Sequence, residues 1–452
     1  MFLGLNKLKS IRIKQIYLQI PLFFVYYSME IGDIMNEIFG IDKELIELFS
    51  KAEIELKDIF KKYDETALLW SSKVLKAFQD NWVASSDFVE VTGYGYSDEG
   101  RDKLERIYAQ IFGAEDALVR PQIMSGTHAL GLTLFGVLKY GDTMISITGE
   151  PYDSLRTVIG TSGDSRNSLI ANGVKYEQIE LIDNDFDIPA IVARLKKSKV
   201  KLVEIQRSRG YSQRKSLTID KIERVCKAIK ETDPDVIIMV DNCYGDMVED
   251  REPTHVGADI IVGSLMKNLG AGIAKTGGYV VGRKDLINDV AERFSAPGIG
   301  KDIGANMDQN LSFYKGLFFA PSVVASSLKT MTFASFMLSK LGFEVDPTFD
   351  EIRTDIIQTI NLGDPDKLVA FCGGIQKGCP IESFVTPVPA PMPGYPHDEV
   401  MAGGSFTTGA TIELSCDGPM CEPYTAYMQG GLTYEYGKIG ILLAIKEIMK
   451  NK

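Results

Sequence analysis

The feature that most constrains the fold is a regular alternation of short apolar segments with amphipathic segments, which begins near residue 117. Apolar residues recur at helical spacing over 188–196 and 219–229, between segments short enough to be strands. Strands that alternate with helices predict an α/β fold with a mostly parallel sheet, covered by helices on both faces. Ligands bind such sheets at the carboxyl ends of the strands, so polar residues there are candidates for a site. We expect strands at 143–147, 176–182, 200–205, 236–240, 259–262 and 279–281.

The sequence pattern divides the chain into four parts. Residues 29–95 have helical periodicity and are interpreted as an N-terminal helical arm. Residues 96–341 form the predicted large domain, which ends in a long apolar helix at 317–341. Residues 342–452 contain Pro-rich turns and a final helix and are interpreted as a smaller C-terminal α+β domain. Residues 1–28 are a separate N-terminal extension.

The extension has a basic stretch followed by a 13-residue apolar run at 16–28. This run is short for a transmembrane helix, which needs about 20 apolar residues, and it lacks a good small-residue cleavage site for a signal peptide. We favour a translation start at Met29 or Met35; a functionally minor extension and an export or membrane-association segment remain open. We expect a cytoplasmic protein with no membrane partner.

Charge and composition exclude several classes of function. The net charge is −12 and no basic block is present, which argues against a nucleic-acid partner. The six cysteines are scattered and form no CxxC pair, so neither a disulfide framework nor a cysteine metal site is expected. Three histidines, none near another, disfavour a zinc site and a His-based catalytic triad.

Polar residues that could take part in catalysis or binding lie at three strand or helix ends of the alternating region. Asp241 ends one apolar strand, and Ser264 with Lys267 follows the next. Taken alone, the aspartate is commonly a helix cap and the lysine a solvated loop residue. The segment Ser125-Gly126-Thr127 opens an apolar helix, where small residues act as caps but free amides also bind anions.

Together these residues match the needs of pyridoxal 5'-phosphate. Its aldehyde requires a lysine for a Schiff base, which Lys267 offers, and its ring nitrogen requires a buried carboxylate, which Asp241 offers. Its phosphate requires a helix amino end with hydroxyl groups nearby, as supplied by Gly126, Thr127 and Ser264. The coincidence of all three favours this cofactor over three unrelated structural roles.

The sequence resembles the fold-type-I pyridoxal-phosphate enzymes, and Asp241-Asn242 is similar to the Asp-Asn pair of the cystathionine and methionine lyases. Nearly all of residues 35–452 resembles the bacterial methionine gamma-lyase-like proteins, also called the aluminium-resistance family. The resemblance implies a sheet of the seven-stranded type in the large domain. It is carried by the motifs GYGYSDEGRDKLE, SGTHAL, GEPYDSL, IQRSRGY, VDNCYG, GSLMKN, KTGGYVVGRKDL, SAPGIGK, RTDIIQ, FCGGIQKG and MQGGLTYEYGKIGILLA.

The resemblance also implies roles for individual residues. Lys267 would bind the cofactor and shuttle protons, and Asp241 would pair with the pyridinium nitrogen. Tyr152 would stack on the cofactor ring; a core or turn aromatic is the alternative interpretation. Tyr94 resembles a tyrosine that reaches the phosphate of the neighbouring subunit, which implies a homodimer or homotetramer with active sites shared across the dimer interface.

The chain departs from the lyase pattern at the groups expected to bind anions. Tyr96 stands where lyases commonly have a phosphate-binding arginine, although Arg101 is near. Glu413 stands where an arginine binds the substrate carboxylate, and a glutamate there would repel it. The remaining candidates for substrate-binding residues are Arg207, Arg209 and Arg353, the first two favoured because they follow a predicted strand.

These observations predict a carbon–sulfur lyase that eliminates a thiol from a methionine-, cystathionine- or cysteine-like amino acid, giving a 2-oxo acid and ammonia. Another pyridoxal-phosphate reaction, such as transamination, aldol cleavage or decarboxylation, remains open because of Glu413. A non-catalytic metal-tolerance protein is a further alternative, but the sequence offers no clustered acidic ligand loop.

Overall fold

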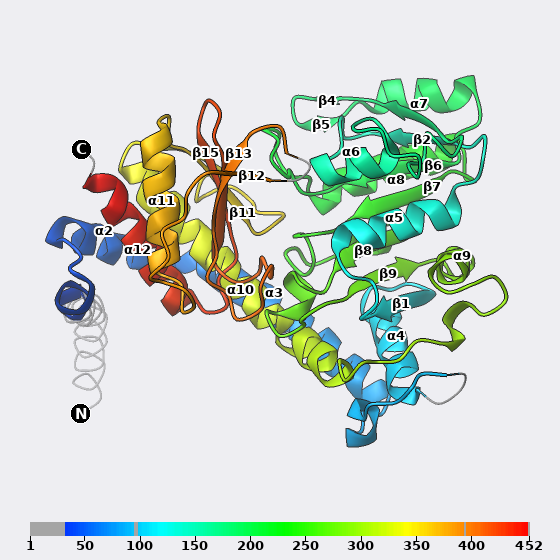
Figure 1. Cartoon of the computed structure of the whole chain (residues 1–452), viewed down its shortest axis with the longest axis horizontal. Helices are drawn as coiled ribbons and strands as arrows, with labels where there is room; N and C mark the ends of the chain where they lie inside the picture. Colours follow the sequence, from blue (N-terminus) through cyan, green and yellow to red (C-terminus); the bar gives the residue numbers. More distant parts are fainter. Residues whose placement is uncertain (1–31, 95–97, 393–394, 451–452) are drawn as a thin grey trace, which may run out of the picture.

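The computed structural model of the chain describes residues 32–94, 98–392 and 395–450. Two bodies lie side by side, each built on its own sheet, and long helices run along both (Figure 1). The predicted extension 1–28 lies outside the described residues, and so do Gly95 and Tyr96.

The larger body contains a seven-stranded sheet, as predicted. Its order is β1-β9-β8-β7-β6-β2-β3, in which β9 runs antiparallel to both of its neighbours and the other strands are mutually parallel. The central strands are buried over their whole length, which explains their nearly continuous apolar sequences. The strands are β1 Asp116–Arg120, β2 Thr143–Ser146, β3 Lys175–Gln178, β6 Leu202–Gln206, β7 Ile237–Asp241, β8 Ile260–Ser264 and β9 Gly278–Gly282.

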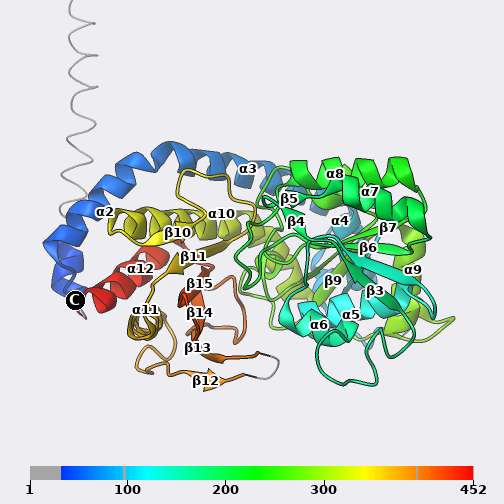
Figure 2. The same ribbon diagram turned by 90° about the horizontal axis from the view of Figure 1, so that it is seen from above.

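Helices cover both faces of this sheet. One face packs against α5 Gly126–Val137, α6 Asp153–Ile159 and α9 Lys284–Phe294. The other packs against α4 Glu99–Ile111, together with α7 Ile188–Lys197 and α8 Ile219–Thr232 (Figure 2). Each face of the sheet therefore has its own apolar core.

The smaller body contains a six-stranded antiparallel sheet in the order β10-β11-β15-β14-β13-β12. Helices α11 Pro365–Lys377 and α12 Tyr434–Met449 pack against each other beside it. Helix α2 Lys43–Glu55, from the N-terminal arm, also contributes to this core. The strands are β10 Glu344–Asp346, β11 Ile357–Asn361, β12 Ala390–Pro391, β13 Asp398–Ala402, β14 Ser415–Pro419 and β15 Thr425–Gln429.

Helix α10 Asn310–Lys340 joins the two bodies and packs along α3 Lys57–Asp80. Its first half belongs to the core of the large sheet, and its second half to the core of the small body. Among the described residues, α10 is the one helix long and apolar enough by composition to cross a membrane, and 67% of its most apolar window is buried inside the protein. Its apolar sequence therefore matches a core helix shared by both bodies.

All six predicted strands are confirmed, with two differences. The segment predicted at 176–182 is divided into β3 and the short β4 Leu181–Ile182, which pairs with β5 Asp185–Phe186 in a separate hairpin. Strand β1 was not predicted, because its five residues, DALVR, are too few and too mixed to show a strand-like hydrophobic pattern. The predicted helices at 188–196, 219–229 and 317–341 correspond to α7, α8 and the second part of α10.

Two adjacent glycines of α11 provide a test of helix packing. A Cβ at Gly374 would lie 2.4 Å from the Ala444 Cα of α12, whereas a Cβ at Gly373 would meet nothing within 4 Å. We expect Gly374→Ala to lower the free energy of unfolding by about 1–3 kcal/mol through overpacking. Gly373→Ala should raise it by about 0.5–1 kcal/mol, since alanine favours the helix. Urea unfolding measures both, and equal effects would contradict the close α11–α12 contact.

Candidate functional site

The carboxyl ends of β6, β7 and β8 lie at one edge of the large sheet, beside a cavity of about 300 Å³. The strands are in register, with Gln206 opposite Asp241 and Asp241 opposite Val262. Residues of β14 and β15, in the small body, also line the cavity. Its lining contains Ser125, Gly126, Thr127, Tyr152, Asp153, Ser154, Gln206, Ser208, Gly210, Tyr211, Asp241, Cys243, Tyr244, Ser264, Met266, Lys267, Ile357, Tyr395, Gly409, Asp417, Tyr427 and Gln429.

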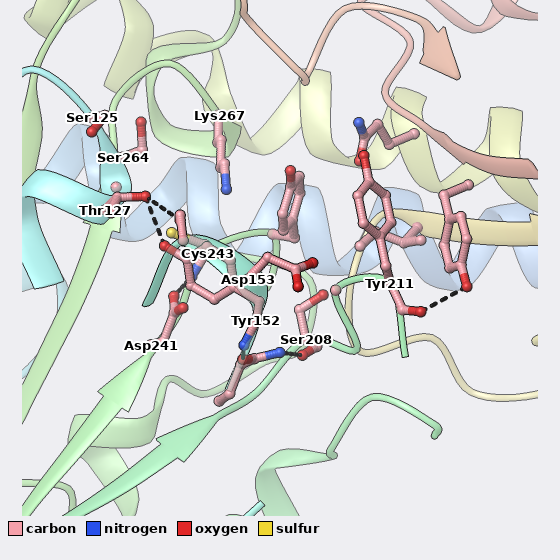
Figure 3. A pocket seen from close by; sticks show the side chains of 18 of the residues that line it. Ser125, Thr127, Tyr152, Asp153, Ser208, Tyr211, Asp241, Cys243, Ser264 and Lys267 are labelled. Atoms are coloured by element: carbon pink, nitrogen blue, oxygen red, sulfur yellow. Dashed lines mark hydrogen bonds between the residues drawn. The ribbon is translucent and has the colours of Figure 1, made fainter. Parts of the chain in front are cut away.

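Asp241 is the last residue of β7, and its carboxylate faces the cavity from below (Figure 3). The Cys243 backbone N–H donates a hydrogen bond to its Oδ1 at 3.0 Å. Burial raises the pKa of Asp241, while Lys267 acts in the opposite direction by favouring the charged form. The site therefore holds a buried carboxylate that can share a proton with a basic group placed against it.

Lys267 follows β8 at the start of a short 3₁₀ turn, Asn268–Gly270. Its Nζ lies 3.7 Å from the centre of the Tyr244 ring, which favours the ammonium form through the ring's negative face. Burial opposes the charge of Lys267, but Cys243, Tyr244 and Asp241 outweigh burial, and its pKa lies above the ordinary value. The amine therefore points into the cavity with a carboxylate nearby to balance it.

The amino end of α5 forms a cradle for an anion. Ser125 caps this 12-residue helix by accepting a hydrogen bond from the His128 N–H at 3.1 Å. A Cβ at Gly126 would lie 3.1 Å from the Cys243 Sγ and 3.5 Å from the Ser264 Cβ, so only glycine keeps this space open. Free amides at a helix start and the hydroxyl groups beside them are suited to a phosphate group.

Tyr152 lies between this cradle and Asp241. Its hydroxyl shares a hydrogen bond of 2.8 Å with the Thr127 Oγ1, which also contacts the Ser154 hydroxyl at 2.8 Å. Its backbone N–H donates to the Gln206 Oε1 at 2.9 Å. Burial, followed by the charge of Asp241, raises the pKa of Tyr152, so its hydroxyl stays protonated at neutral pH.

The structure brings together Ser125, Gly126, Thr127, Tyr152, Asp241, Ser264 and Lys267, all of which were predicted as site residues. It does not place Tyr94 in the cavity. The Tyr94 side chain is 80% exposed, and its backbone forms a bridge with Ile303. Contact with a neighbouring subunit stays a prediction for this residue. Arg101 hydrogen bonds to the backbone oxygens of Gly93 and Gly304 at 3.1 and 3.3 Å and does not line the cavity.

The predicted substrate-binding arginines are also absent from the cavity lining within the described parts of the chain. Arg207 is fully buried and donates to the Asn242 Oδ1 at 2.7 Å, so its charge supports the strand that carries Asp241. Arg209 pairs with Asp346, and Arg353 donates to the Thr332 hydroxyl at 2.9 Å. Arg207 and Arg209 follow β6 as predicted, but neither they nor Arg353 line this cavity.

Glu413 does not face the cavity either. It accepts hydrogen bonds from the backbone N–H groups of Phe406 and Thr407, both at 2.9 Å, and so fixes the loop before β14. The expected repulsion of a substrate carboxylate by Glu413 therefore does not arise in this conformation.

Several lining residues were not predicted. Tyr211, Tyr395, Asp417, Tyr427 and Gln429 come from loops and from the small body and meet only when the two bodies pack. The local signal for one of them is the Gly210-Tyr211 pair in IQRSRGY, in the loop that follows the end of β6 at Gln206. Gln206 is the last residue of β6, so the strand-end argument applied to Asp241 would also have identified it.

Among residues 32–94, 98–392 and 395–450, no group of three or more His, Cys, Asp or Glu side chains is placed to hold a metal ion. At the sheet edge the cavity combines one amine, that of Lys267, with the buried carboxylate of Asp241 and an anion cradle. This set fits an aldehyde cofactor with a phosphate group.

Comparison with known proteins agrees with this class of site. The family model described as methionine gamma-lyase matches residues 45–449, and the chain belongs to this family. YnbB of Bacillus subtilis is 45% identical over 404 residues, which is 89% of this chain and 96% of YnbB. A carbon-sulfur lyase involved in aluminum resistance from Clostridium novyi NT has a TM-score of 0.88 and 43% identity, over 92% of this chain and 98% of that protein.

Two further solved structures extend the comparison. A proposed cystathionine beta-lyase involved in aluminum resistance from Clostridium acetobutylicum has a TM-score of 0.88 and 44% identity, over 91% of this chain and 97% of its own. The pyridoxal-5'-phosphate dependent protein YhfS from Escherichia coli shares the fold, with a TM-score of 0.60 and 16% identity over 86% of this chain and 97% of YhfS. The fold-type-I architecture predicted from the sequence is confirmed.

We expect the stability of the protein to depend on pH through Glu204, which is buried on β6 near Asp241. Burial raises its pKa from 4.5 to about 7, with Asp241 adding to the shift and the Ser146 hydroxyl opposing it. The folded state thus binds the Glu204 proton more tightly than the unfolded state, and this residue costs stability as the pH rises from about 4.5 to about 7.

We therefore expect Glu204→Gln to raise the free energy of unfolding relative to the wild-type protein. This increase should be about 2 kcal/mol larger at about pH 8 than at about pH 5. Urea unfolding at the two pH values measures this difference. An unchanged effect of the substitution at both values would contradict a neutral, buried Glu204.

Proposed function

We propose that the protein is a pyridoxal-phosphate-dependent carbon–sulfur lyase that eliminates a thiol from a methionine-, cystathionine- or cysteine-like amino acid. The single observation that carries the proposal is the buried pair of Asp241 and Lys267 at one cavity, next to the open cradle at Gly126. Membership of the methionine gamma-lyase family supports the same chemistry. The products are a thiol, a 2-oxo acid and ammonia.

The residues present fit this cofactor. Its phosphate would lie at the amino end of α5, near Gly126, Thr127 and Ser264, where space is kept free of a Cβ. Its ring nitrogen would face Asp241, whose raised pKa indicates a carboxylate that gains from a neighbouring proton donor. When bound, pyridoxal phosphate supplies an aldehyde that condenses with amines and a ring that withdraws electrons from the substrate Cα.

The chain's own residues then move and hold protons. The Lys267 Nζ lines the cavity against the Tyr244 ring and, as a free amine, would be the base that takes the Cα proton. Asp241, a buried carboxylate, would hold a proton on the ring nitrogen of the bound cofactor. The Tyr152 hydroxyl is held by Thr127 and stays protonated, so it can donate a hydrogen bond at the cofactor.

The leaving thiol requires a proton as the carbon–sulfur bond breaks. Lys267, carrying the proton from Cα, and the hydroxyl groups of Tyr152 and Tyr211 are among the donors that line the cavity and could supply it. We propose further that a second copy of the chain completes the site through Tyr94, which is 80% exposed and does not line the cavity of its own chain.

The proposal is tested by product stoichiometry. The purified protein, loaded with pyridoxal phosphate, should release thiol, 2-oxo acid and ammonia in equal amounts from at least one of methionine, cystathionine and cysteine. Thiol reagents, a lactate-dehydrogenase-type assay and glutamate dehydrogenase measure the three products. Lys267→Ala should lower the rate of product release by at least about a thousandfold, since it removes the proton-transfer group. The far-UV circular dichroism spectrum should remain unchanged.

Transfer of the amino group to an added 2-oxo acid, without free thiol, would contradict the lyase and support a transaminase.

A further inference from the structure

The far wall of the cavity, opposite Lys267, is acidic and aromatic. Asp417 of β14 and Tyr427 of β15 form it together with Tyr211 and Tyr395, and we refer to these four residues as the distal wall. Among the described residues that line the cavity, Lys267 is the one cation, whereas Asp153, Asp241 and Asp417 are carboxylates. The charge of the distal wall is thus not balanced by a basic side chain of the cavity.

Asp417 has no ion-pair partner among the described residues. Its Oδ2 accepts a weak hydrogen bond from the Gln429 Nε2 at 3.4 Å. Burial raises the pKa of Asp417 to about 6, and hydrogen bonds from Tyr211 and Gln429 limit the rise. At neutral pH the group is therefore mainly a carboxylate, held in a partly dry cavity without a counter-charge.

A second carboxylate lies behind the first. Glu399 of β13 is 4% exposed, and its Oε2 has no hydrogen-bond partner. Strand pairing places Met401 opposite Asp417 and Glu399 two residues away, so Glu399 and Asp417 share one face of the sheet. Burial raises the pKa of Glu399 to about 7, with Asp417 and Asp153 adding to the rise. A cation in the cavity would meet Asp417 directly, and Glu399, outside the lining on the same sheet face, would add to the attraction.

The aromatic rings point to the same kind of ligand. The Tyr211 ring centre lies 4.9 Å from that of Tyr427 and 5.6 Å from that of Tyr395, and the three rings border the cavity. The Tyr427 hydroxyl donates to the Tyr211 backbone oxygen at 2.8 Å and so fixes this arrangement. Aromatic faces beside carboxylates are a recurrent means of binding an ammonium group.

We infer that the distal wall binds an ammonium group at the far end of the substrate side chain, so that the favoured substrate expels a thiol that carries a positive charge. The inference rests on the proposed carbon–sulfur lyase activity and names its substrate class. A side chain ending in a carboxylate is disfavoured, because two like charges at short range in this cavity repel. An uncharged alkyl thioether leaves Asp417 and Glu399 without compensation.

A simple probe of this substrate class is S-(2-aminoethyl)cysteine, from which the proposed lyase would eliminate a thiol. The Cα–H and Cβ–S bonds break, the sulfur receives a proton, and one water molecule hydrolyses the remaining enamine. The products are cysteamine, pyruvate and ammonia. No oxidant or reductant is required.

The test compares this probe with S-propylcysteine, which has the same number of heavy atoms but ends in a methyl group. We expect kcat/KM for the aminoethyl probe to exceed that for the propyl probe by at least about tenfold in the wild-type holoenzyme, as for a partly desolvated ion pair. Asp417→Asn should reduce this ratio toward one, and Glu399→Gln should reduce it in part.

Asp398→Asn is the matched control, because Asp398 precedes Glu399 on β13 but its side chain is exposed to solvent. It should leave the ratio unchanged. If Asp417→Asn fails to fold, the Glu399→Gln protein tests the carboxylate next to the distal wall, and an unchanged ratio would then overturn the inference.

A binding measurement separates the inference from the activity. Lys267→Ala cannot complete the reaction, so calorimetric titration in the presence of pyridoxal phosphate yields dissociation constants for both probes. Tighter binding of the aminoethyl probe, lost on adding Asp417→Asn, supports the inference even if no sulfur amino acid is cleaved. Equal binding and equal kcat/KM for the two probes would overturn it, while cleavage of both would leave the lyase activity standing.

Discussion

The register of three parallel strands is the constraint on which the site depends. The last residues of β6 and β7, Gln206 and Asp241, pair with each other, and β8 continues two residues beyond Val262, the partner of Asp241, to Ser264, so all three ends lie at one edge of the sheet. Gln206 then fixes the backbone of Tyr152, and the turn after Ser264 carries Lys267 into the same cavity. A slip of one residue in any of these strands would turn its terminal side chain to the opposite face.

Bringing these strand ends together buries the charge of Asp241, which is unfavourable, and the surrounding residues compensate for it. Asp241 is balanced by Lys267, and the strand end behind it is held by a buried network in which Arg207 and Glu252 both bind Asn242. In that network the Arg207 Nη1 contacts the Asn242 Oδ1 at 2.7 Å, and the Asn242 amide contacts the Glu252 Oε2 at 2.8 Å. The distal wall has no such internal compensation, which is why we assign its counter-charge to the substrate.

The sequence was sufficient to predict six of the seven strands of the large sheet and the part of the site that their ends create. Asp241 ends one short apolar segment and Lys267 follows another, and such segments are recognisable in the sequence by themselves. The small residues at the start of the apolar helix that begins at Gly126 are recognisable in the same way. Asp417 and Tyr427 could not be predicted in the same way, since they reach the cavity only when the small body packs on the large one. Arg207 was assigned to the substrate because position after a strand does not reveal which buried partner, here Asn242, a side chain meets.

The most direct test of the account is borohydride reduction of the purified protein, followed by peptide mass mapping. If Asp241 and Lys267 form a pyridoxal-phosphate site, the visible absorption band should disappear on reduction, and the peptide that contains Lys267 should carry one phosphopyridoxyl group. The Lys267→Ala protein, reduced in the same way, should carry none. A colourless protein that takes up no added cofactor, or an adduct on a different lysine, would contradict the account.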